Sequence, residues 1–277
     1  MPRHTLLIAS ALAVFVQFLA WPATAQEAKS EPELLWHQAS ALFPIRAHLP
    51  ENFDSTRVYP AVIALHGFRG SSVRFERIGR AFAQAGFIAV VPEGPYPVPY
   101  PSADSARQSS WELSTWTEEY GLGAPLTDDP AIERRSVEIT ILEFLPSVID
   151  RVQERYRVDP LYVFGFSLGG SYALLGGFYH RDWIDGIVVF SLDGIDRVWF
   201  TAQGDSLESG NHLPVRWVSG RSDPMIPFSH AERARDVLKE AGYQVFLDDF
   251  PGGHTVPDDA LQRAVNWLKD LADAHRP

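Results

Sequence analysis

The chain alternates between short, mainly apolar segments and longer stretches in which apolar residues recur every three or four positions. The short segments end in Gly, Pro or polar residues, as strands buried on both faces of a sheet do. They occupy residues 59–67, 87–94, 161–167, 186–191, 215–220 and 245–250. A weaker apolar–polar alternation at 43–49 (FPIRAHL) predicts a further strand at the edge of the sheet.

Helical periodicity fills the intervals between these strands. It covers 74–86, 132–156, 229–242 and 259–274, and a helix of small residues follows position 167. Pro146 predicts a kink or break in the second stretch, and Ser229 predicts the N-cap of the third. Strands that alternate with helices predict a mostly parallel central sheet, right-handed crossovers and helices on both faces. We therefore expect a single α/β domain over 26–277, without a separate lid domain.

The first 25 residues predict a secretory signal peptide. Arg3 and His4 precede the apolar run LLIASALAVFVQFLA, and the small-residue pattern Ala-Thr-Ala ends at Ala25. The alternative is an uncleaved membrane anchor, but a 15-residue apolar run is short for a membrane span. We expect an exported protein, periplasmic or secreted, with no stable membrane anchoring after cleavage of the signal.

Composition narrows the classes of function. The chain is 45% hydrophobic and 21% charged, which is ordinary for a globular protein. It contains no Cys, which excludes disulfides, a thiol nucleophile and thiolate metal sites. Cleavage at Ala25 removes one Arg and changes the formal net charge from −11 to −12. Such an acidic surface repels phosphate backbones, so we expect no nucleic-acid partner.

Two connections are longer than a strand–helix turn requires. The first, 92–131, has five prolines between positions 92 and 101, followed by several aromatic residues, and the second covers about 194–213. Long loops in compact domains are commonly functional. The first follows the carboxyl end of a predicted strand, the edge at which open α/β sheets bind ligands. It is therefore predicted to be an active-site loop.

The segment GFSLGGS at 165–171 has the spacing of a nucleophile elbow. It follows the apolar strand LYVF and opens a helix, the strand–turn–helix context that such an elbow requires. Gly165 and Gly169 are small enough for the sharp turn around Ser167. The helix N-terminus then directs its N–H groups and positive dipole end towards the serine oxygen. Ser167 is the predicted nucleophile, and Ser171 is read as a small residue that allows close helix packing.

A serine hydroxyl needs a base to take its proton. In this architecture an acid and then a histidine follow the serine, each after a later strand. Asp223 comes three residues after 215–220, and His254 comes four residues after 245–250 on a Gly-Gly loop. We predict a Ser167–Asp223–His254 triad. Asp193, which follows the strand at 186–191, is the alternative acid.

The segment ALHGFRG at 64–70 is predicted to form part of the oxyanion hole, the remaining element of such a site. It ends the strand before the first helix, where one oxyanion-hole N–H donor is expected. The second donor is expected from the residue after the nucleophile. We assign these donors to Phe68 and Leu168. His66 is predicted to hold the turn by hydrogen bonds and not to act as a base.

Taken in chain order, HGFRG, GFSLGG, GRSDPMIP, FPGGHTVP and the closing WL resemble the α/β-hydrolase superfamily, over about residues 57–270. They are most similar to the phospholipase/carboxylesterase branch, which includes lysophospholipases and acyl-protein thioesterases. The resemblance implies an acyl- or alcohol-binding pocket lined by the loop after 87–94, with Trp111 as a candidate substrate contact. The alternative for Trp111 is packing of the loop onto the core. Leu168 departs from the Gln that is common in this branch, and the export signal departs from its cytosolic members.

These features predict an exported serine esterase that cleaves small to medium acyl esters of small-molecule substrates. No cofactor is expected, and no metal site is expected because the histidines show neither H-x-x-x-H nor H-E-x-x-H spacing. Two alternatives share the fold. A prolyl-oligopeptidase-like peptidase or amidase uses the same triad but usually carries a gating domain, for which this chain has no room. A non-catalytic binding protein typically lacks part of the triad.

Overall fold

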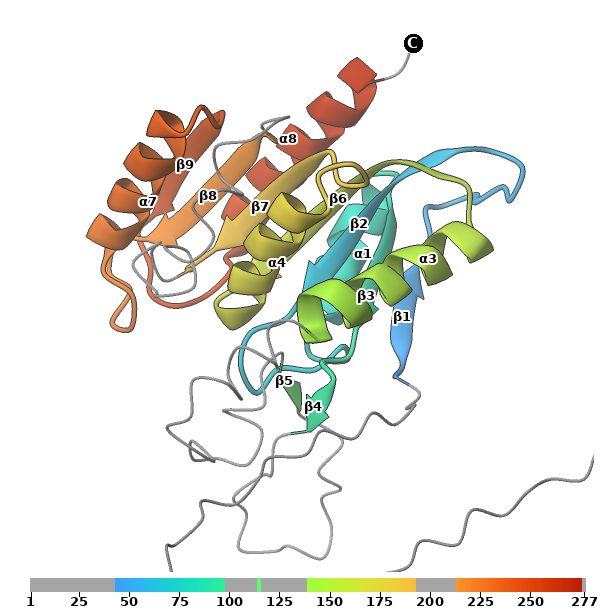
Figure 1. The fold of residues 1–277 in the computed structure, drawn as a ribbon, viewed down its shortest axis with the longest axis horizontal. Helices are drawn as coiled ribbons and strands as arrows, with labels where there is room; N and C mark the ends of the chain where they lie inside the picture. The colour runs from blue at the N-terminus through green and yellow to red at the C-terminus, as the bar shows by residue number, and fades with distance from the viewer. Residues whose placement is uncertain (1–42, 98–113, 116–138, 193–212, 276–277) are drawn as a thin grey trace, which may run out of the picture. The chain divides into compact units, whose positions relative to one another are not determined.

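Seven strands form one sheet in a computed structural model of the chain, which describes residues 43–97, 114–115, 139–192 and 213–275. The strands are β1 Ile45–His48, β2 Tyr59–Leu65, β3 Ile88–Pro92, β6 Val158–Phe166, β7 Gly186–Phe190, β8 Val215–Gly220 and β9 Val245–Phe250. Their spatial order is β1-β3-β2-β6-β7-β8-β9 (Figure 1). β1 is antiparallel to β3, and all other neighbours are parallel. The predicted mostly parallel sheet and its edge strand at 43–49 are confirmed.

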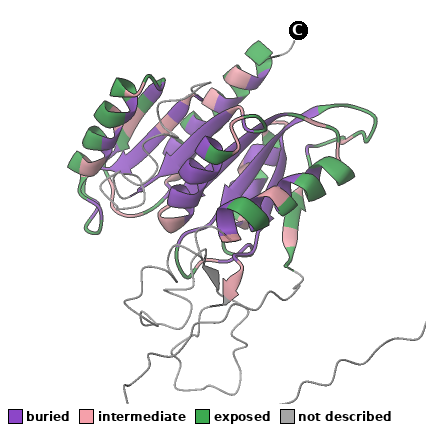
Figure 2. Cartoon of the chain, viewed as in Figure 1, coloured by how far each residue is buried: buried purple, intermediate pink, exposed green. Residues whose placement is uncertain are grey.

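Helices cover both faces of the sheet. Successive strand residues point to opposite faces, and because nearly all of them are apolar, both faces must be buried. The helices are α1 Glu76–Gln84, α3 Leu145–Arg155, α4 Leu168–Tyr179, α7 Phe228–Glu240 and α8 Asp258–His275. Ile63 of β2 belongs to a core cluster with residues of α3, α4 and α7, whereas the adjacent Val62 belongs to a second cluster with residues of α1 and α8. The strands are buried between these two layers (Figure 2). Burial of each large aliphatic side chain stabilises the fold by about 1.5–3 kcal/mol.

The helical stretch is not interrupted at Pro146 but changes its type there, next to the predicted kink or break. A π-helical turn, Ile139–Phe144, ends immediately before α3 begins at Leu145, and Pro146 lies in the first turn of α3. A proline is tolerated there because the first N–H groups of a helix have no partner within it. The Ser147 hydroxyl donates to the Phe144 carbonyl oxygen at 2.7 Å, which supports the junction.

The predicted N-cap at Ser229 is wrong. α7 begins at Phe228, its N-cap is Pro227 with φ −55°, and no side chain caps it. Proline fixes φ close to the helical value, so the helix starts before the serine is reached. Ser229 is therefore an exposed residue of the first turn.

Part of the predicted active-site loop is visible as two short antiparallel strands. β4 Tyr96–Pro97 pairs with β5 Ser114–Thr115. Trp111 and Asp193 lie outside the described residues, as does the predicted signal peptide at 1–25. Within the described residues, no helix is both long and apolar enough to cross a membrane.

Candidate active site

The three residues of the predicted triad meet at the carboxyl edge of the sheet. Ser167 directly follows β6, Asp223 follows β8, and His254 follows β9. The Nε2 atom of His254 lies 2.9 Å from Ser167 Oγ, and its Nδ1 atom lies 2.8 Å from Asp223 Oδ2. With the proton on Nδ1, the imidazole donates to the carboxylate and accepts the serine O–H. The structure thus brings all three side chains into one hydrogen-bonded chain.

Ser167 occupies a strained turn between β6 and α4. Its backbone has φ 52° and ψ −124°, a conformation that L-residues rarely adopt. The Ser167 N–H donates to Phe190 O at 2.8 Å, and its own carbonyl oxygen accepts the N–H of Gly170 at 2.8 Å. These bonds attach the turn to β7 and to the first turn of α4. The serine side chain is therefore held at one position above the sheet edge.

The two glycines flanking Ser167 are required by backbone contacts. A Cβ on Gly165 would lie 2.3 Å from the Gly169 carbonyl oxygen, and a Cβ on Gly169 would lie 2.3 Å from the carbonyl oxygens of Leu65 and His66. Both distances are far below van der Waals contact. The small residues predicted on either side of the turn are thus necessary, and Gly169 also brings the start of α4 against the end of β2.

Asp223 is oriented by bonds to both carboxylate oxygens. Its Oδ1 accepts the N–H groups of Met225 (2.9 Å) and Ile226 (3.0 Å), while Oδ2 faces His254. Burial opposes ionisation, but the hydrogen bonds from His254, Ile226 and Met225 outweigh it and hold the pKa of Asp223 below its ordinary value. The residue therefore stays charged next to the imidazole.

The loops that carry the acid and the histidine pack directly on each other. A Cβ on Gly220 would lie 2.3 Å from the Gly252 carbonyl oxygen, and the Ser222 N–H donates to that oxygen at 2.9 Å. The His254 ring also packs against the Phe166 ring, and the two ring centroids lie 5.0 Å apart. Together these contacts fix the imidazole between the acid and the serine.

His66 holds the turn after β2 through both ring nitrogens. The Gly94 N–H lies 3.3 Å from Nε2, so Nε2 is the acceptor and Nδ1 donates to the Gly67 carbonyl oxygen at 2.9 Å. The side chain is 1% exposed, and burial lowers the pKa of His66 despite the opposing effects of the Gly67 bond and Glu93. This neutral imidazole agrees with the structural role expected for His66.

The two predicted oxyanion donors lie on adjoining segments. Phe68 belongs to the turn that His66 holds, and Leu168 is the first residue of α4, where N–H groups have no acceptor within the helix. The close approach at Gly169 joins these segments. Ser171, predicted to be a packing residue, is 5% exposed in the interior of α4.

Glu93 is a buried residue of the site that sequence reasoning missed. It follows β3 and accepts the Ser72 N–H at 2.9 Å, while the Ser72 hydroxyl accepts a hydrogen bond from Arg46 Nε at 3.1 Å. The Glu93 side chain also lies 3.7 Å from His66 Nε2. The only sequence signal was an acidic residue at the end of an apolar strand. These bonds connect the turn after β2 to β3 and to the edge strand β1.

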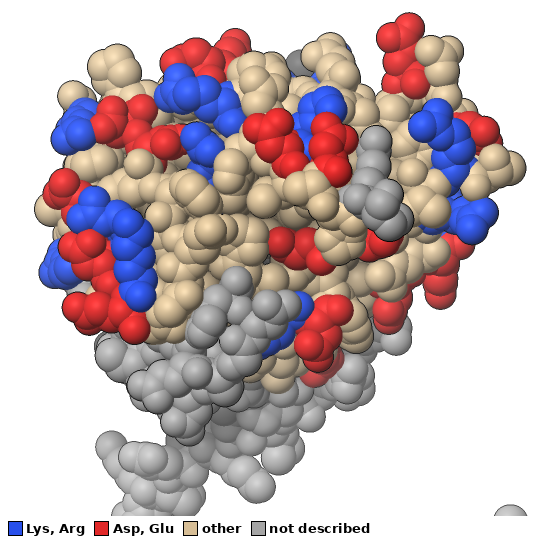
Figure 3. Space-filling view, turned by 90° about the horizontal axis from the view of Figure 1, so that it is seen from above, with Lys and Arg blue, Asp and Glu red and all other residues tan. Residues whose placement is uncertain are grey.

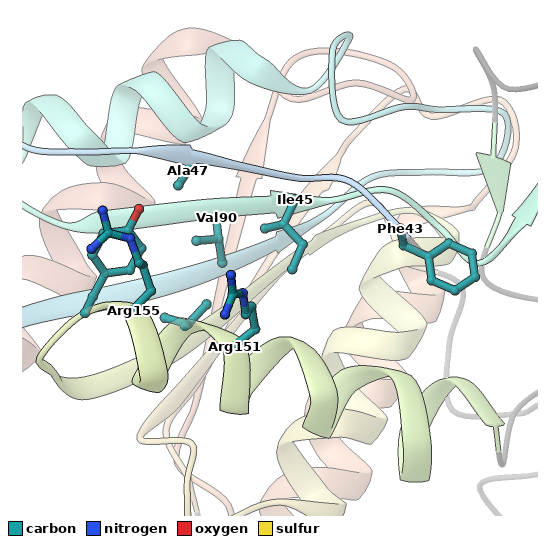
Figure 4. Close-up of a pocket in the computed structure, with 8 residues that line it drawn as sticks. Phe43, Ile45, Ala47, Val90, Arg151 and Arg155 are labelled. Carbon is teal, nitrogen blue, oxygen red and sulfur yellow. The ribbon is translucent and has the colours of Figure 1, made fainter. Parts of the chain in front are cut away.

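A cavity of about 230 Å³ opens beside the triad and is lined by His254, Phe68 and Phe166, among others. A second cavity, of about 260 Å³, lies between β1, β3 and α3, and Arg151 and Arg155 project into it from α3 (Figure 4). No triad residue lines the second cavity. The first is therefore the candidate active-site cavity.

Metal-binding groups and surface charge were compared with the expectations from the sequence. No group of three or more His, Asp or Glu side chains is arranged to hold a metal ion among the described residues. On the face shown in Figure 3, acidic and basic side chains are interleaved.

Comparison with known proteins identifies relatives of the same fold. The esterase PE8 structure superposes with a TM-score of 0.62 at 19% identity and covers 83% of this chain and 99% of that one. A carboxylesterase of Bacillus cereus gives a TM-score of 0.59 at 16% identity, covering 84% and 95%.

Curated relatives match shorter regions. Acyl-protein thioesterase 1 of Neurospora crassa is 26% identical over 145 residues, which is 50% of this chain and 59% of the relative. Its namesake in Gibberella zeae is 27% identical over 106 residues, or 38% and 45%. The matches therefore span about half the length of these relatives. The family model described as "Putative esterase" matches residues 42–276. The chain therefore belongs to this esterase family, within the α/β-hydrolases of the phospholipase/carboxylesterase group.

Proposed function

We propose that this chain is an exported serine hydrolase that cleaves carboxylic esters of small to medium acyl groups through an acyl-enzyme. The observation that carries the proposal is the continuous hydrogen-bonded chain from Ser167 Oγ through His254 to Asp223. It lies beside a cavity, at the edge of the sheet where α/β proteins bind ligands. Membership of an esterase family supports the same chemistry.

In the first step, the serine oxygen attacks the ester carbonyl carbon. His254 Nε2 takes the Ser167 hydroxyl proton as the new C–O bond forms, and the carbonyl π electrons move onto oxygen. The N–H groups of Phe68 and Leu168 stabilise this oxyanion, and the positive end of the α4 dipole adds to their effect. Asp223 keeps the proton on Nδ1 and stabilises the imidazolium.

In the second step, the tetrahedral intermediate expels the alcohol. The C–O bond to the leaving group breaks, His254 gives its proton to that oxygen, and the acyl group remains on Ser167. Water then repeats both steps: His254 takes a proton from the water, the hydroxide adds to the acyl carbon, and Ser167 leaves with that proton. The products are one carboxylic acid and one alcohol.

His66 does not compete for the role of base. Its Nε2 already accepts the Gly94 N–H, and its Nδ1 donates to Gly67 O. Taking a proton would break the first bond and place a charge in a buried site, which is unfavourable. The division of labour between the two histidines follows from these contacts.

The proposed size of the acyl group and the proposed export of the protein rest on separate observations. A cavity of about 230 Å³ is below the range of about 300–1,000 Å³ typical of drug-sized ligands, which favours small to medium substrates. The names of the thioesterase relatives make thioesters a second substrate class for the same triad. Export is proposed from the charged, apolar and small-residue regions of residues 1–25.

The test compares two serines of one motif. Ser167→Ala should reduce kcat on 4-nitrophenyl butyrate by about 10⁵–10⁶-fold and abolish labelling by a fluorophosphonate probe. Ser171→Ala, four residues further along α4, should retain both. Asp223→Ala and Asp193→Ala separate the two candidate acids, and only the first should lose activity. Near-normal turnover by Ser167→Ala, or activity lost to EDTA, would refute the serine mechanism.

A further inference from the structure

The cavity beside the triad is unusual in its charge. Two arginines line it, Arg74 from the segment that leads into α1 and Arg77 from the first turn of α1, and no Asp or Glu is found among its described lining residues. The apolar side chains of Phe75, Phe166 and Val256 complete its walls. This local excess of positive charge occurs in a chain whose formal net charge is −11.

The two arginines differ in how their charge is balanced. Arg77 donates to Asp258 Oδ1 at 2.8 Å and also to the Val256 carbonyl oxygen. Glu76, the nearest acid in sequence, pairs with Arg80 at 2.8 Å. Among the described residues, no carboxylate pairs with Arg74. Its guanidinium is therefore the uncompensated charge of the cavity.

The position of Arg74 is set by the turn that precedes α1. Its N–H donates to Ser71 Oγ at 3.2 Å, and Ser71 is 3% exposed. Nearby, Arg69 has φ 54° and its guanidinium lies over the Phe68 ring, 5.2 Å from the centroid. Arg69 thus adds a second positive charge beside Phe68, a residue of the cavity wall.

We propose that Arg74 binds a carboxylate or phosphate group carried by the alcohol part of the ester, and that Arg69 adds to the positive electrostatic potential there. This inference rests on the proposed function and specifies its substrate class. His254 must protonate the leaving oxygen, so the alcohol lies against the imidazole. The cavity is lined by His254 and by the next two residues, Thr255 and Val256. The alcohol part therefore extends towards Arg74, and the apolar walls contact its carbon frame.

The experiment compares pairs of substrates of similar size in which one member carries a carboxylate and the other is neutral. The ratio of kcat/KM for 4-(butyryloxy)benzoate to that for 4-(butyryloxy)benzamide measures recognition of an anion on the alcohol. The ratio for 4-nitrophenyl hemisuccinate to 4-nitrophenyl butyrate measures recognition of an anion on the acyl group. Each ratio is determined for the wild type, Arg74→Gln, Arg74→Lys and Arg151→Gln, an exposed arginine of α3 away from the cavity.

We expect Arg74→Gln to lower the first ratio about fivefold, because a partly exposed ion pair contributes modestly. Arg74→Lys should keep most of the ratio, Arg151→Gln should keep all of it, and added salt should lower the wild-type ratio. The second ratio should not depend on Arg74. An unchanged first ratio in Arg74→Gln, or an effect confined to the second ratio, overturns the proposal. If the wild type hydrolyses neither neutral ester, the proposed function itself fails, which is a different result.

Discussion

Replacing Gly169 by alanine tests whether the contact between α4 and β2 sets the spacing of the proposed oxyanion donors, Phe68 and Leu168. The added Cβ would lie 2.3 Å from the carbonyl oxygens of both Leu65 and His66. An ordinary contact needs at least 3.4 Å, so the start of α4 must move by about 1.1 Å relative to the end of β2. Both obstructing atoms are backbone, so no side-chain rotation relieves the clash.

This displacement has two measurable consequences. It moves Leu168 relative to Phe68, and a misplacement of about 1 Å in a catalytic constellation can cost about 10²-fold in rate. Overpacking of this kind also destabilises a protein by about 1–3 kcal/mol. We therefore expect Gly169→Ala to lower kcat on 4-nitrophenyl butyrate by about 100-fold, with KM little changed, and to lower the free energy of unfolding measured in urea.

The next residue of the same helix provides a matched control. A Cβ on Gly170 would lie 3.4 Å from the Gly165 carbonyl oxygen and from Leu192 Cβ, which is ordinary contact. Gly170→Ala should leave kcat unchanged and can gain up to about 1 kcal/mol from helix propensity. Wild-type kcat in Gly169→Ala, or equal losses in the two variants, would show that this contact does not set the donor spacing.

Two further predictions concern pH. Asp223→Asn should reduce kcat about 10⁴-fold. Because the pKa of Asp223 is lowered in the fold, its stabilising effect is complete above the unfolded value of about 3.9 and is lost as pH falls through the folded value. Urea titrations should therefore show the stability gap between wild type and Asp223→Asn staying constant above about pH 5 and closing as the pH falls below about 4; a gap that stays constant down to about pH 2.5 would contradict this. Burial lowers the pKa of His66, so the unfolded chain binds its proton first, and stability should fall as pH drops below about 6.5. In His66→Gln, the slope of unfolding free energy against pH between 6.5 and 5 should be smaller than in wild type, and an equal slope would refute this origin.

Sequence patterns predicted the parts of the fold that depend on local chemistry. Continuous apolar segments identified the strands because a parallel sheet covered on both faces needs apolar residues at every position. Pro146 predicted a kink or break in the 132–156 stretch because its ring disfavours a helix interior, and the π-helical turn changes to α3 at the residue before it. The predicted N-cap of α7 was wrong because Pro227 and Ser229 both suit a helix start, and the sequence pattern alone does not distinguish them.

The meeting of Ser167, Asp223 and His254 could also be predicted, because the carboxyl ends of parallel strands share one edge. The network around Glu93 could not. Its partner Ser72 is 21 residues away, and nothing in local periodicity brings the two together. The free charge of Arg74 was likewise hidden, since it depends on which nearby carboxylates pair with other arginines.

The strain at Ser167 explains why so many glycines surround the site. A residue with φ 52° and ψ −124° costs of order 1–3 kcal/mol and persists only where its surroundings hold it. Here the hydrogen bond to Phe190 O holds the turn from one side. The contacts of Gly165 and Gly169 hold it from the other, because each lets backbone approach to a distance that a Cβ would forbid. A relaxed turn would release these contacts and separate α4 from the turn of His66. The same packing that keeps the serine strained therefore keeps the proposed oxyanion donors in place, so nucleophile and donors should be lost together.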